Sequence, residues 1–136
     1  TVASPRCRSW AGRDRSDATQ VDLKQGMGAL IDIEFILQGM VLAHASTHPT
    51  ILDTTASSSL IDMLRDVGLL TGLQADTLHV AHADLLQMGL ACTLDLRSRV
   101  AARTPALDAL CAGVGRVAVE LGFDFEAADG EARQAV

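Results

Sequence analysis

Apolar residues recur along most of the chain with the spacing of helices rather than strands. From Gly28 or Ala29 to about His48 they fall at positions 30, 33, 37, 40 and 41, and also at 31, 35 and 42, so this segment is apolar nearly all round. A helix with that pattern is buried on every side. His44 and His48 are expected in its last two turns, where a cation meets the negative end of the helix dipole, and Pro49 closes it.

A short helix and a long helix are predicted next. Ser57–Ser59 begin the short one, and Gly68 ends it. Thr71 and Gln74 form a capping-box pair for the long one, from about Leu73 to Ala101. The residues expected to face inward are Leu60, Met63, Leu64 and Val67 on the short helix, and Leu78, Ala81, Leu85, Met88, Cys92 and Leu96 on the long one.

Thr104 and Pro105 are typical N-cap and N1 residues for a fourth helix, which Gly122 ends. Its inward residues are predicted to be Leu107, Leu110, Cys111, Val114, Val117 and Leu121. Asp124 is a candidate cap for a short fifth helix. The expected fold is therefore all-α, an antiparallel bundle of four to five helices over residues 22–136. Residues 1–21 lack periodicity and are expected to be a disordered or linker-like lead-in.

Composition and charge support this picture. The 136 residues are 49% hydrophobic with one Trp and no Tyr, which favours helices over a sheet. The formal charge is −6: residues 1–24 hold five basic and three acidic side chains, and the remainder holds six basic and fourteen acidic. An acidic body without a basic stripe argues against nucleic-acid binding.

The cysteines and the apolar runs bear on location. Cys7, Cys92 and Cys111 are far apart and lack C-x-x-C spacing, so they are interpreted as free thiols in a reducing cytosol. No apolar run approaches the roughly 20 residues needed to cross a bilayer. We expect a cytoplasmic protein with no membrane partner. Because the first residue is Thr, we interpret the chain as a piece of a longer protein.

The stretch "LKQGMGALIDIEFILQ", residues 23–38, carries the candidate chemistry. Gly26 and Gly28 precede a helix, where backbone N–H groups at the positive helix end suit a phosphate and Lys24 could reach over it. The alternative is that the glycines only let the chain pass into a crowded core, and the pattern alone favours that alternative. The stretch is not a Walker loop, because it lacks G-K-[ST].

Two carboxylates lie inside this apolar run. Asp32 and Glu34 are two residues apart, so they point to different sides of the helix and cannot form a paired-carboxylate site. Glu34 shares its face with Gln38. A carboxylate in an apolar helix is costly without a partner, so at least one should face something outside this chain or an internal arginine such as Arg65 or Arg97.

Residues 22–38 resemble the signature K-x-G-x-G-G-x-x-D-I-E-F-x-x-Q of glutamine synthetase adenylyltransferase. The likeness continues through "LAHASTHPTILDTTASSSLIDMLRDVGLL", residues 42–70, and fades after about residue 95. Two departures are visible. The family usually has a second glycine where this chain has Ala29, and an arginine where it has Leu86. The missing arginine removes one internal partner for a buried carboxylate.

The resemblance implies a function. The family is bifunctional, with two related halves, each a nucleotidyltransferase domain followed by a helical domain. One half transfers AMP from ATP to a tyrosine of glutamine synthetase, and the other removes it. The D-I-E-F spelling resembles the helical domain of the C-terminal, adenylylating half. The family responds to the PII signal protein and to glutamine, and the full-length enzyme needs ATP and Mg²⁺.

The resemblance also implies roles for residues. Lys24, Gly26, Gly28, Asp32 and Glu34, with Gln38 beside them, would face the adjacent nucleotidyltransferase domain, with Lys24 closest to nucleotide phosphate. The nucleotidyltransferase motif, a Gly-Ser pair with spaced aspartates, is absent from this sequence. The isolated chain is therefore expected to hold no cofactor and to be inactive, serving to orient the protein substrate or to carry regulatory signals.

Two alternatives remain from other functional classes. His44 and His48 are spaced i, i+4 and His79 and His82 i, i+3, so a two-helix zinc site with Asp84 nearby is conceivable. The ordinary interpretation is that the first pair serves a helix C-terminus and the second lies in the core or at the surface. The other alternative is a helical protein-interaction module, which rests only on the abundance of amphipathic helices.

Overall fold

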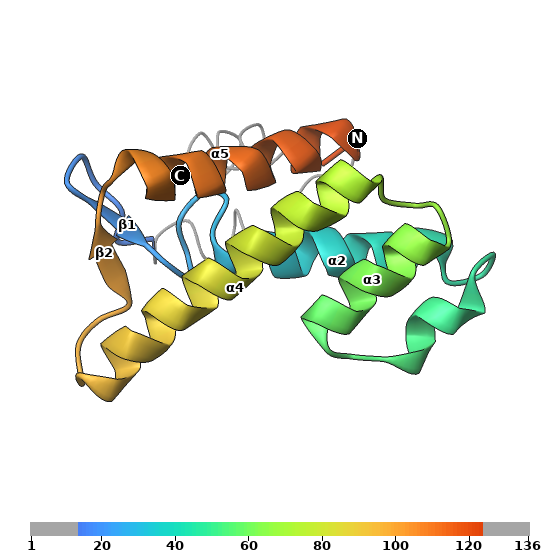
Figure 1. Ribbon diagram of the computed structural model, residues 1–136, viewed down its shortest axis with the longest axis horizontal. Coiled ribbons are helices and arrows are strands. Elements are labelled where there is room, and N and C mark those ends of the chain that lie inside the picture. Colours follow the sequence, from blue (N-terminus) through green and yellow to red (C-terminus); the bar gives the residue numbers. More distant parts are fainter. Residues whose placement is uncertain (1–13, 124–136) are drawn as a thin grey trace, which may run out of the picture.

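The computed structural model describes residues 14–123, most of which are helical (Figure 1). The predicted all-α bundle is confirmed. The long helix α4 crosses the molecule diagonally in Figure 1 and packs against three other helices. The helices are α2 (Leu30–His44), the 3-10 helix η2 (Pro49–Asp53), α3 (Ser57–Asp66), α4 (Gly72–Leu94) and α5 (Pro105–Glu120).

The predicted caps are confirmed at three helices. The Thr71 hydroxyl accepts the N–H of Gln74, and the Gln74 side chain accepts the N–H of Thr71, which completes a capping box for α4. At α5, the Thr104 hydroxyl caps the helix by accepting the N–H of Leu107. Gly68 and Gly122 follow α3 and α5 with φ of 84° and 90°. Local residue chemistry thus sets these helix ends.

The predicted end of α2 is wrong by four residues. The helix ends at His44, so His48 lies beyond it as the residue before η2. Both the N–H and the hydroxyl of Thr47 bond the carbonyl oxygen of His44, each at 3.1 Å. A side-chain hydroxyl that donates to a nearby backbone carbonyl oxygen competes with the hydrogen bonds that would extend the helix.

The predicted end of α4 is also wrong. The helix ends at Leu94 instead of continuing to Ala101. Leu96 takes a left-handed conformation with φ of 57°, and its N–H bonds the carbonyl oxygen of Thr93 while that of Arg97 bonds Cys92. This is a Schellman ending with leucine where glycine is usual. Leu96, predicted to face inward, is 96% exposed.

A small two-stranded sheet replaces the last turns of the predicted helix. β2 (Val100–Ala102) pairs antiparallel with β1 (Gln20–Asp22), with Gln20 opposite Ala102. β1 begins at Gln20, inside the segment predicted to be a lead-in, where no strand was expected. Three-residue strands carry no detectable alternation, which is why the pattern missed them. The predictions for Cys7 and Asp124 lie outside the described residues.

The core lies where α2, α3, α4 and α5 meet. Among the described residues, no helix is long and apolar enough to cross a membrane. Cys92 and Cys111 are both free thiols. The fully buried large side chains are Leu23, Ile33, Ile36, Ile51, Ile61, Leu64, Leu78, Leu85, Leu107, Val114 and Asp32. A carboxylate within this set needs a partner inside the chain.

Arg103 fastens the sheet to α5. Its guanidinium donates to the carbonyl oxygen of Asp17 at 2.8 Å and to the Asp108 carboxylate on α5 at 2.7 Å. The Asp17 carboxylate in turn accepts the hydroxyl and the N–H of Thr19, which lower the pKa of that carboxyl. These contacts join the turn before β1, the end of β2 and the first turn of α5.

Candidate functional site

The turn between β1 and α2 is organised by the buried carboxylate of Asp22. One carboxylate oxygen accepts the N–H groups of Lys24 and Gln25 at 3.0 and 2.9 Å, and the other accepts the N–H of Arg15 at 3.1 Å. Asp22 is only 3% exposed. An aspartate that bonds backbone N–H groups two and three residues ahead is a common turn former. Sequence reasoning missed this role.

Asp32 has the same kind of role at the start of α2. Its side chain has no exposed surface, and one carboxylate oxygen accepts the N–H of Gly28 at 2.7 Å. Asp32 lies in the first turn of the helix, where a negative charge also meets the positive end of the helix dipole. A buried carboxylate is therefore used to bind the chain's own backbone.

The amides at this helix start bond the chain itself. The N–H groups of Gly26, Ala29, Leu30 and Ile31 bond the carbonyl oxygens of Asp22, Gly26, Leu23 and Lys24, respectively, at 3.0 to 3.2 Å. Because internal acceptors already occupy these amides, the geometry gives no support to the hypothesis that they hold a phosphate, which stays a prediction. The alternative interpretation, that the glycines let the chain pass into a crowded core, fits the geometry.

Gly28 shows why a glycine is needed there. Its φ is 74°, and a Cβ at this position would lie 2.2 Å from the carbonyl oxygen of Cys111 on α5. Gly26 is also close to backbone, with a Cβ 2.6 Å from the carbonyl oxygen of Asp22. No side chain fits at such distances unless the backbone moves. Gly28 thus allows the turn to lie against α5, and Gly26 allows it to close against the end of β1.

The structure divides the six predicted site residues into two groups. Lys24, Glu34 and Gln38 have exposed side chains. Gly26, Gly28 and Asp32 are buried within the chain and do not face outward. Asp32 and Glu34 point to different sides of α2, as predicted. Of the two arginines considered as internal partners, Arg65 pairs with Asp62 and Asp66, and Arg97 pairs with Asp95.

The two departures from the family signature have little structural consequence here. Ala29 is fully buried as the residue before α2, with φ of −89°, a conformation that any residue adopts. Leu86 lies on α4 with half of its surface exposed, at 51%. An arginine at that position would lie at the surface, so its replacement by leucine leaves no cavity in the core.

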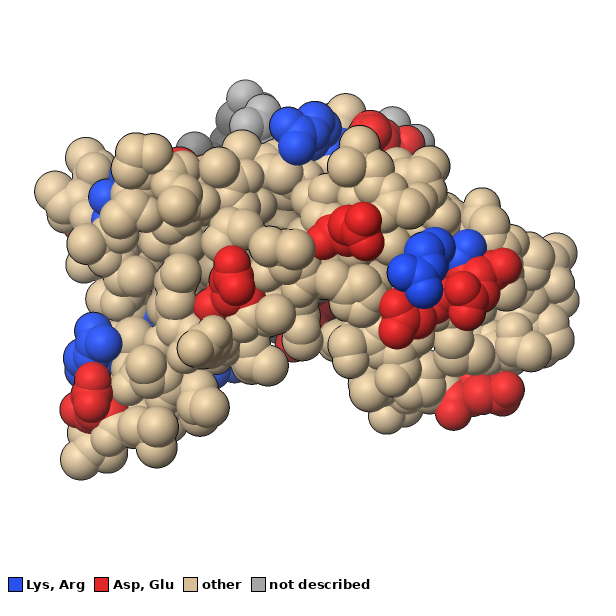
Figure 2. All heavy atoms as spheres, viewed as in Figure 1, with Lys and Arg blue, Asp and Glu red and all other residues tan. Residues whose placement is uncertain are grey.

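The outer face of α4 was not predicted. Five large apolar residues on this helix are 51–78% exposed: Leu73, Val80, Leu86, Leu90 and Leu94. The same helix buries Leu78, Ala81 and Leu85 on its other side. Figure 2 shows that the surface over α4 is mostly uncharged but is interrupted by acidic side chains. We refer to these five residues as the α4 outer face. The signal was present in the sequence, because α4 has apolar residues on both sides.

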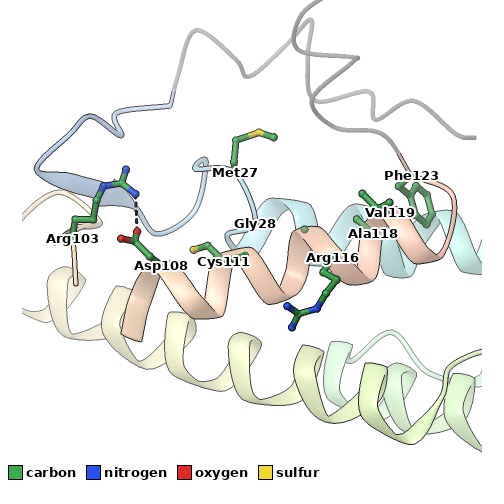
Figure 3. A pocket seen from close by; sticks show the side chains of 11 residues that line it. Met27, Gly28, Arg103, Asp108, Cys111, Arg116, Ala118, Val119 and Phe123 are labelled. Carbon is green, nitrogen blue, oxygen red and sulfur yellow. Dashed lines mark hydrogen bonds and ion pairs between the residues drawn. The ribbon is translucent and has the colours of Figure 1, made fainter. Parts of the chain in front are cut away.

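A hollow of about 550 Å³ lies along α5 (Figure 3). Met27 from the turn and Cys111 from α5 lie on it, Arg103 points toward Asp108, and Arg116 points toward α4. Burial, with the Asp108 carboxylate adding to it, raises the pKa of the Cys111 thiol. A thiol that stays protonated is a poor nucleophile, so the hollow shows no activated group.

The four histidines do not form the alternative metal site. His79 is bonded through Nε2 to the Asp62 carboxylate on α3 at 2.8 Å, and His48 lies outside α2. Within residues 14–123, no three His, Cys, Asp or Glu side chains are placed to share a metal ion. A structural zinc site needs about four ligands. The histidine spacing in the sequence therefore has another origin, which for His79 is a hydrogen bond between α4 and α3.

Comparison with known proteins identifies the relatives. A protein of Stenotrophomonas maltophilia (strain K279a) is 49% identical over 124 residues, and one of Xanthomonas campestris pv. campestris (strain B100) is 43% identical over 129 residues. A protein of Xanthobacter autotrophicus (strain ATCC BAA-1158 / Py2) is 33% identical over 123 residues. All three are named bifunctional glutamine synthetase adenylyltransferase/adenylyl-removing enzyme. The chain belongs with these enzymes as a homologue of one segment.

The match to the adenylyltransferase/adenylyl-removing enzymes extends further than the signature suggested. It covers 90% and 95% of this chain for the first two relatives, beyond residue 95 where the likeness was expected to fade. The chain spans 13% and 14% of the length of those two relatives. No family model matches the chain, and no solved structure matches it.

Proposed function

We propose that this chain is the helical domain that follows the nucleotidyltransferase domain in the C-terminal, adenylylating half of such an enzyme. In that role it packs on the catalytic domain and helps to place glutamine synthetase for AMP transfer from ATP with Mg²⁺. The high identity over most of the chain, against a small part of each relative's length, supports a segment of a larger enzyme. Regulation by the PII protein is part of the same proposal.

The α4 outer face carries the packing proposal. Leu90 and Leu94 are 57% and 75% exposed on a helix whose other side is buried in the core. Large apolar side chains grouped on the exposed side of one helix are typical of a surface that contacts another protein. We infer that the rest of the enzyme covers it, and that the exposed Glu34 and Gln38 on α2 are secondary contacts.

The experiment uses the full-length enzyme with paired serine substitutions. Leu90→Ser with Leu94→Ser should reduce adenylylation of glutamine synthetase by at least about tenfold, because apolar anchors dominate such contacts. The matched control is Leu42→Ser with Leu52→Ser, which alters two leucines that are 85% and 60% exposed on α2 and η2. The control should keep adenylylation within about twofold, since isolated surface leucines contribute little.

Equal losses in the two double variants would contradict the packing proposal. Thermal melts of the 136-residue chain carrying each pair should match the wild type, which separates a lost contact from a lost fold. A further expectation concerns the chain alone. Incubated with ATP, Mg²⁺ and glutamine synthetase, it should transfer no AMP, and labelling by the isolated chain would contradict its assignment as a non-catalytic segment.

A further inference from the structure

A second hollow, of about 570 Å³, lies beside the β1–α2 turn and has an unusual lining. Four of its residues are basic, Arg15, Lys24, Arg97 and Arg99, and one is acidic, Asp22, which gives a formal charge of +3. The chain as a whole carries −6. Positive charge is therefore concentrated at one place in an acidic protein. Its other polar residues are Gln25, Thr93 and Ser98.

The single acidic residue is already used by the fold. Both carboxylate oxygens of Asp22 accept backbone N–H groups, as described above, and the Arg15 guanidinium lies 3.9 Å from one of them. Arg97 pairs with Asp95 at 3.3 Å. Among the ion pairs formed between described residues, none involves Lys24 or Arg99. Two cations at the hollow therefore remain available to a ligand.

The fold, rather than sequence proximity, assembles these cations. Lys24 lies just after β1, and Arg97 and Arg99 lie between α4 and β2, more than seventy residues later. The N–H of Leu23 bonds the carbonyl oxygen of Arg99 at 2.9 Å, which fixes the two backbones side by side. The end of α4 is closed at the same place by the N–H groups of Leu96 and Arg97. The hollow therefore has a fixed backbone frame.

We propose that this hollow binds a compact phosphate anion of several charges, such as a di- or triphosphate group. Guanidinium groups match the geometry of phosphate oxygens, and an ammonium group adds a point charge. The volume is within the range of about 300–1,000 Å³ that small-ligand sites occupy. The inference places the phosphate contact that the sequence suggested for Lys24 at this hollow instead of at the helix start. It rests on the proposed function only for the source of the ligand.

Calorimetric titration of the 136-residue chain tests the proposal without any catalytic readout. The probes are sodium tripolyphosphate and, separately, ATP, both in low-salt buffer without Mg²⁺. The two should bind with similar affinity, since the phosphate chain is what the hollow recognises. Arg99→Gln and Lys24→Gln should each weaken the Kd by about three- to tenfold, as expected for the loss of one charge-assisted contact.

The matched control is Arg116→Gln on α5, which removes the same charge from an exposed arginine that does not line this hollow. It should change the Kd by less than about twofold, because an exposed charge at a distance is screened. An equal loss in Arg116→Gln would overturn the proposal in favour of non-specific attraction. It would also be overturned by absent binding at millimolar tripolyphosphate, by binding of ATP alone, or by preference for an acidic peptide. None of these outcomes depends on adenylylation, so the packing proposal would stand or fall separately.

Discussion

The β1–α2 turn and the α4 outer face depart from the usual distribution of residues in opposite directions. The turn buries two carboxylates, Asp22 and Asp32, whereas the α4 outer face exposes leucines such as Leu90 and Leu94. Each buried carboxylate accepts backbone N–H groups of the chain itself. The exposed leucines, in contrast, lie on the side of α4 opposite to the buried residues of that helix. The buried carboxylates of the turn therefore have hydrogen-bond partners within the chain, whereas the leucines of the α4 outer face remain exposed.

This difference separates a structural motif from a proposed docking surface. A buried charge persists only when hydrogen bonds compensate the loss of water, and the turn supplies those bonds. An exposed apolar face has no such compensation, which is why we propose that a second surface covers it. The buried signature residues Gly26, Gly28 and Asp32 therefore serve the fold, whereas Lys24, Glu34 and Gln38 are its exposed polar groups. The main contact with the rest of the enzyme is proposed for α4, which the signature does not include, and Glu34 and Gln38 are proposed as secondary contacts.

Replacing Gly28 by alanine should have the largest effect on stability. The added Cβ would meet the Cys111 carbonyl oxygen at 2.2 Å, and φ of 74° is unfavourable for alanine. We expect a loss of about 4 kcal/mol in the free energy of unfolding, measured by urea denaturation, from the combined steric and conformational costs.

Gly68→Ala is the matched control for Gly28→Ala. Its φ is 84°, and nothing lies within 4 Å of the added Cβ, so only the conformational cost of about 1 kcal/mol applies. Similar losses at the two glycines would show that the approach to α5 does not constrain the turn.

A pair of leucines on α4 sharpens the contrast between its two sides. Leu85 is fully buried, so Leu85→Ala should cost about 3 kcal/mol through lost packing and a cavity. Leu90 is 57% exposed, and Leu90→Ala in the isolated chain should change stability by less than about 0.5 kcal/mol. Thermal unfolding of both variants gives the comparison. A large loss at Leu90 would mean that the chain itself already covers the outer face.

The helices could be predicted from the sequence where their ends are marked by local chemistry. The capping box at Thr71 and the Thr104–Pro105 start of α5 lie where predicted, because the side chains that define them bond only their own helix. The ends of α2 and α4 could not be predicted. A hydroxyl at Thr47 and a leucine in a left-handed conformation at Leu96 end those helices, and neither residue is a usual stop signal.

The candidate site was predictable only in part. The opposite orientation of Asp32 and Glu34 follows from helical spacing alone. The burial of Asp32 against the N–H of Gly28 depends on the docking of the turn on α5, which no local pattern contains. The basic hollow could not be predicted from the sequence either. Lys24 and Arg99 are far apart in the chain, and the pairing of β1 with β2 brings them to the same hollow. Contacts between segments that are distant in the sequence therefore determine both the burial of Asp32 and the formation of the basic hollow.

Asp32 and Glu34 provide a third comparison, smaller than the first two. Asp32→Ala should cost about 2 kcal/mol, because it leaves the buried N–H of Gly28 without its acceptor. Glu34→Ala, at an exposed position on α2, should cost less than about 0.5 kcal/mol. Urea denaturation of the isolated chain measures both. Equal costs would contradict the division of the signature into a buried half and an exposed half.

Leu96→Gly should have the smallest effect and the opposite sign. Leu96 has φ of 57° and is 96% exposed, so its side chain gains little from packing while its backbone is strained. Glycine removes that strain but loses more conformational entropy on folding, and the net gain should be at most about 1 kcal/mol. The melting temperature should then rise by a few degrees, whereas Leu96→Ala, which keeps a Cβ, should leave it unchanged. A lower melting temperature for Leu96→Gly would show that the leucine side chain contributes more at this corner than its exposure suggests.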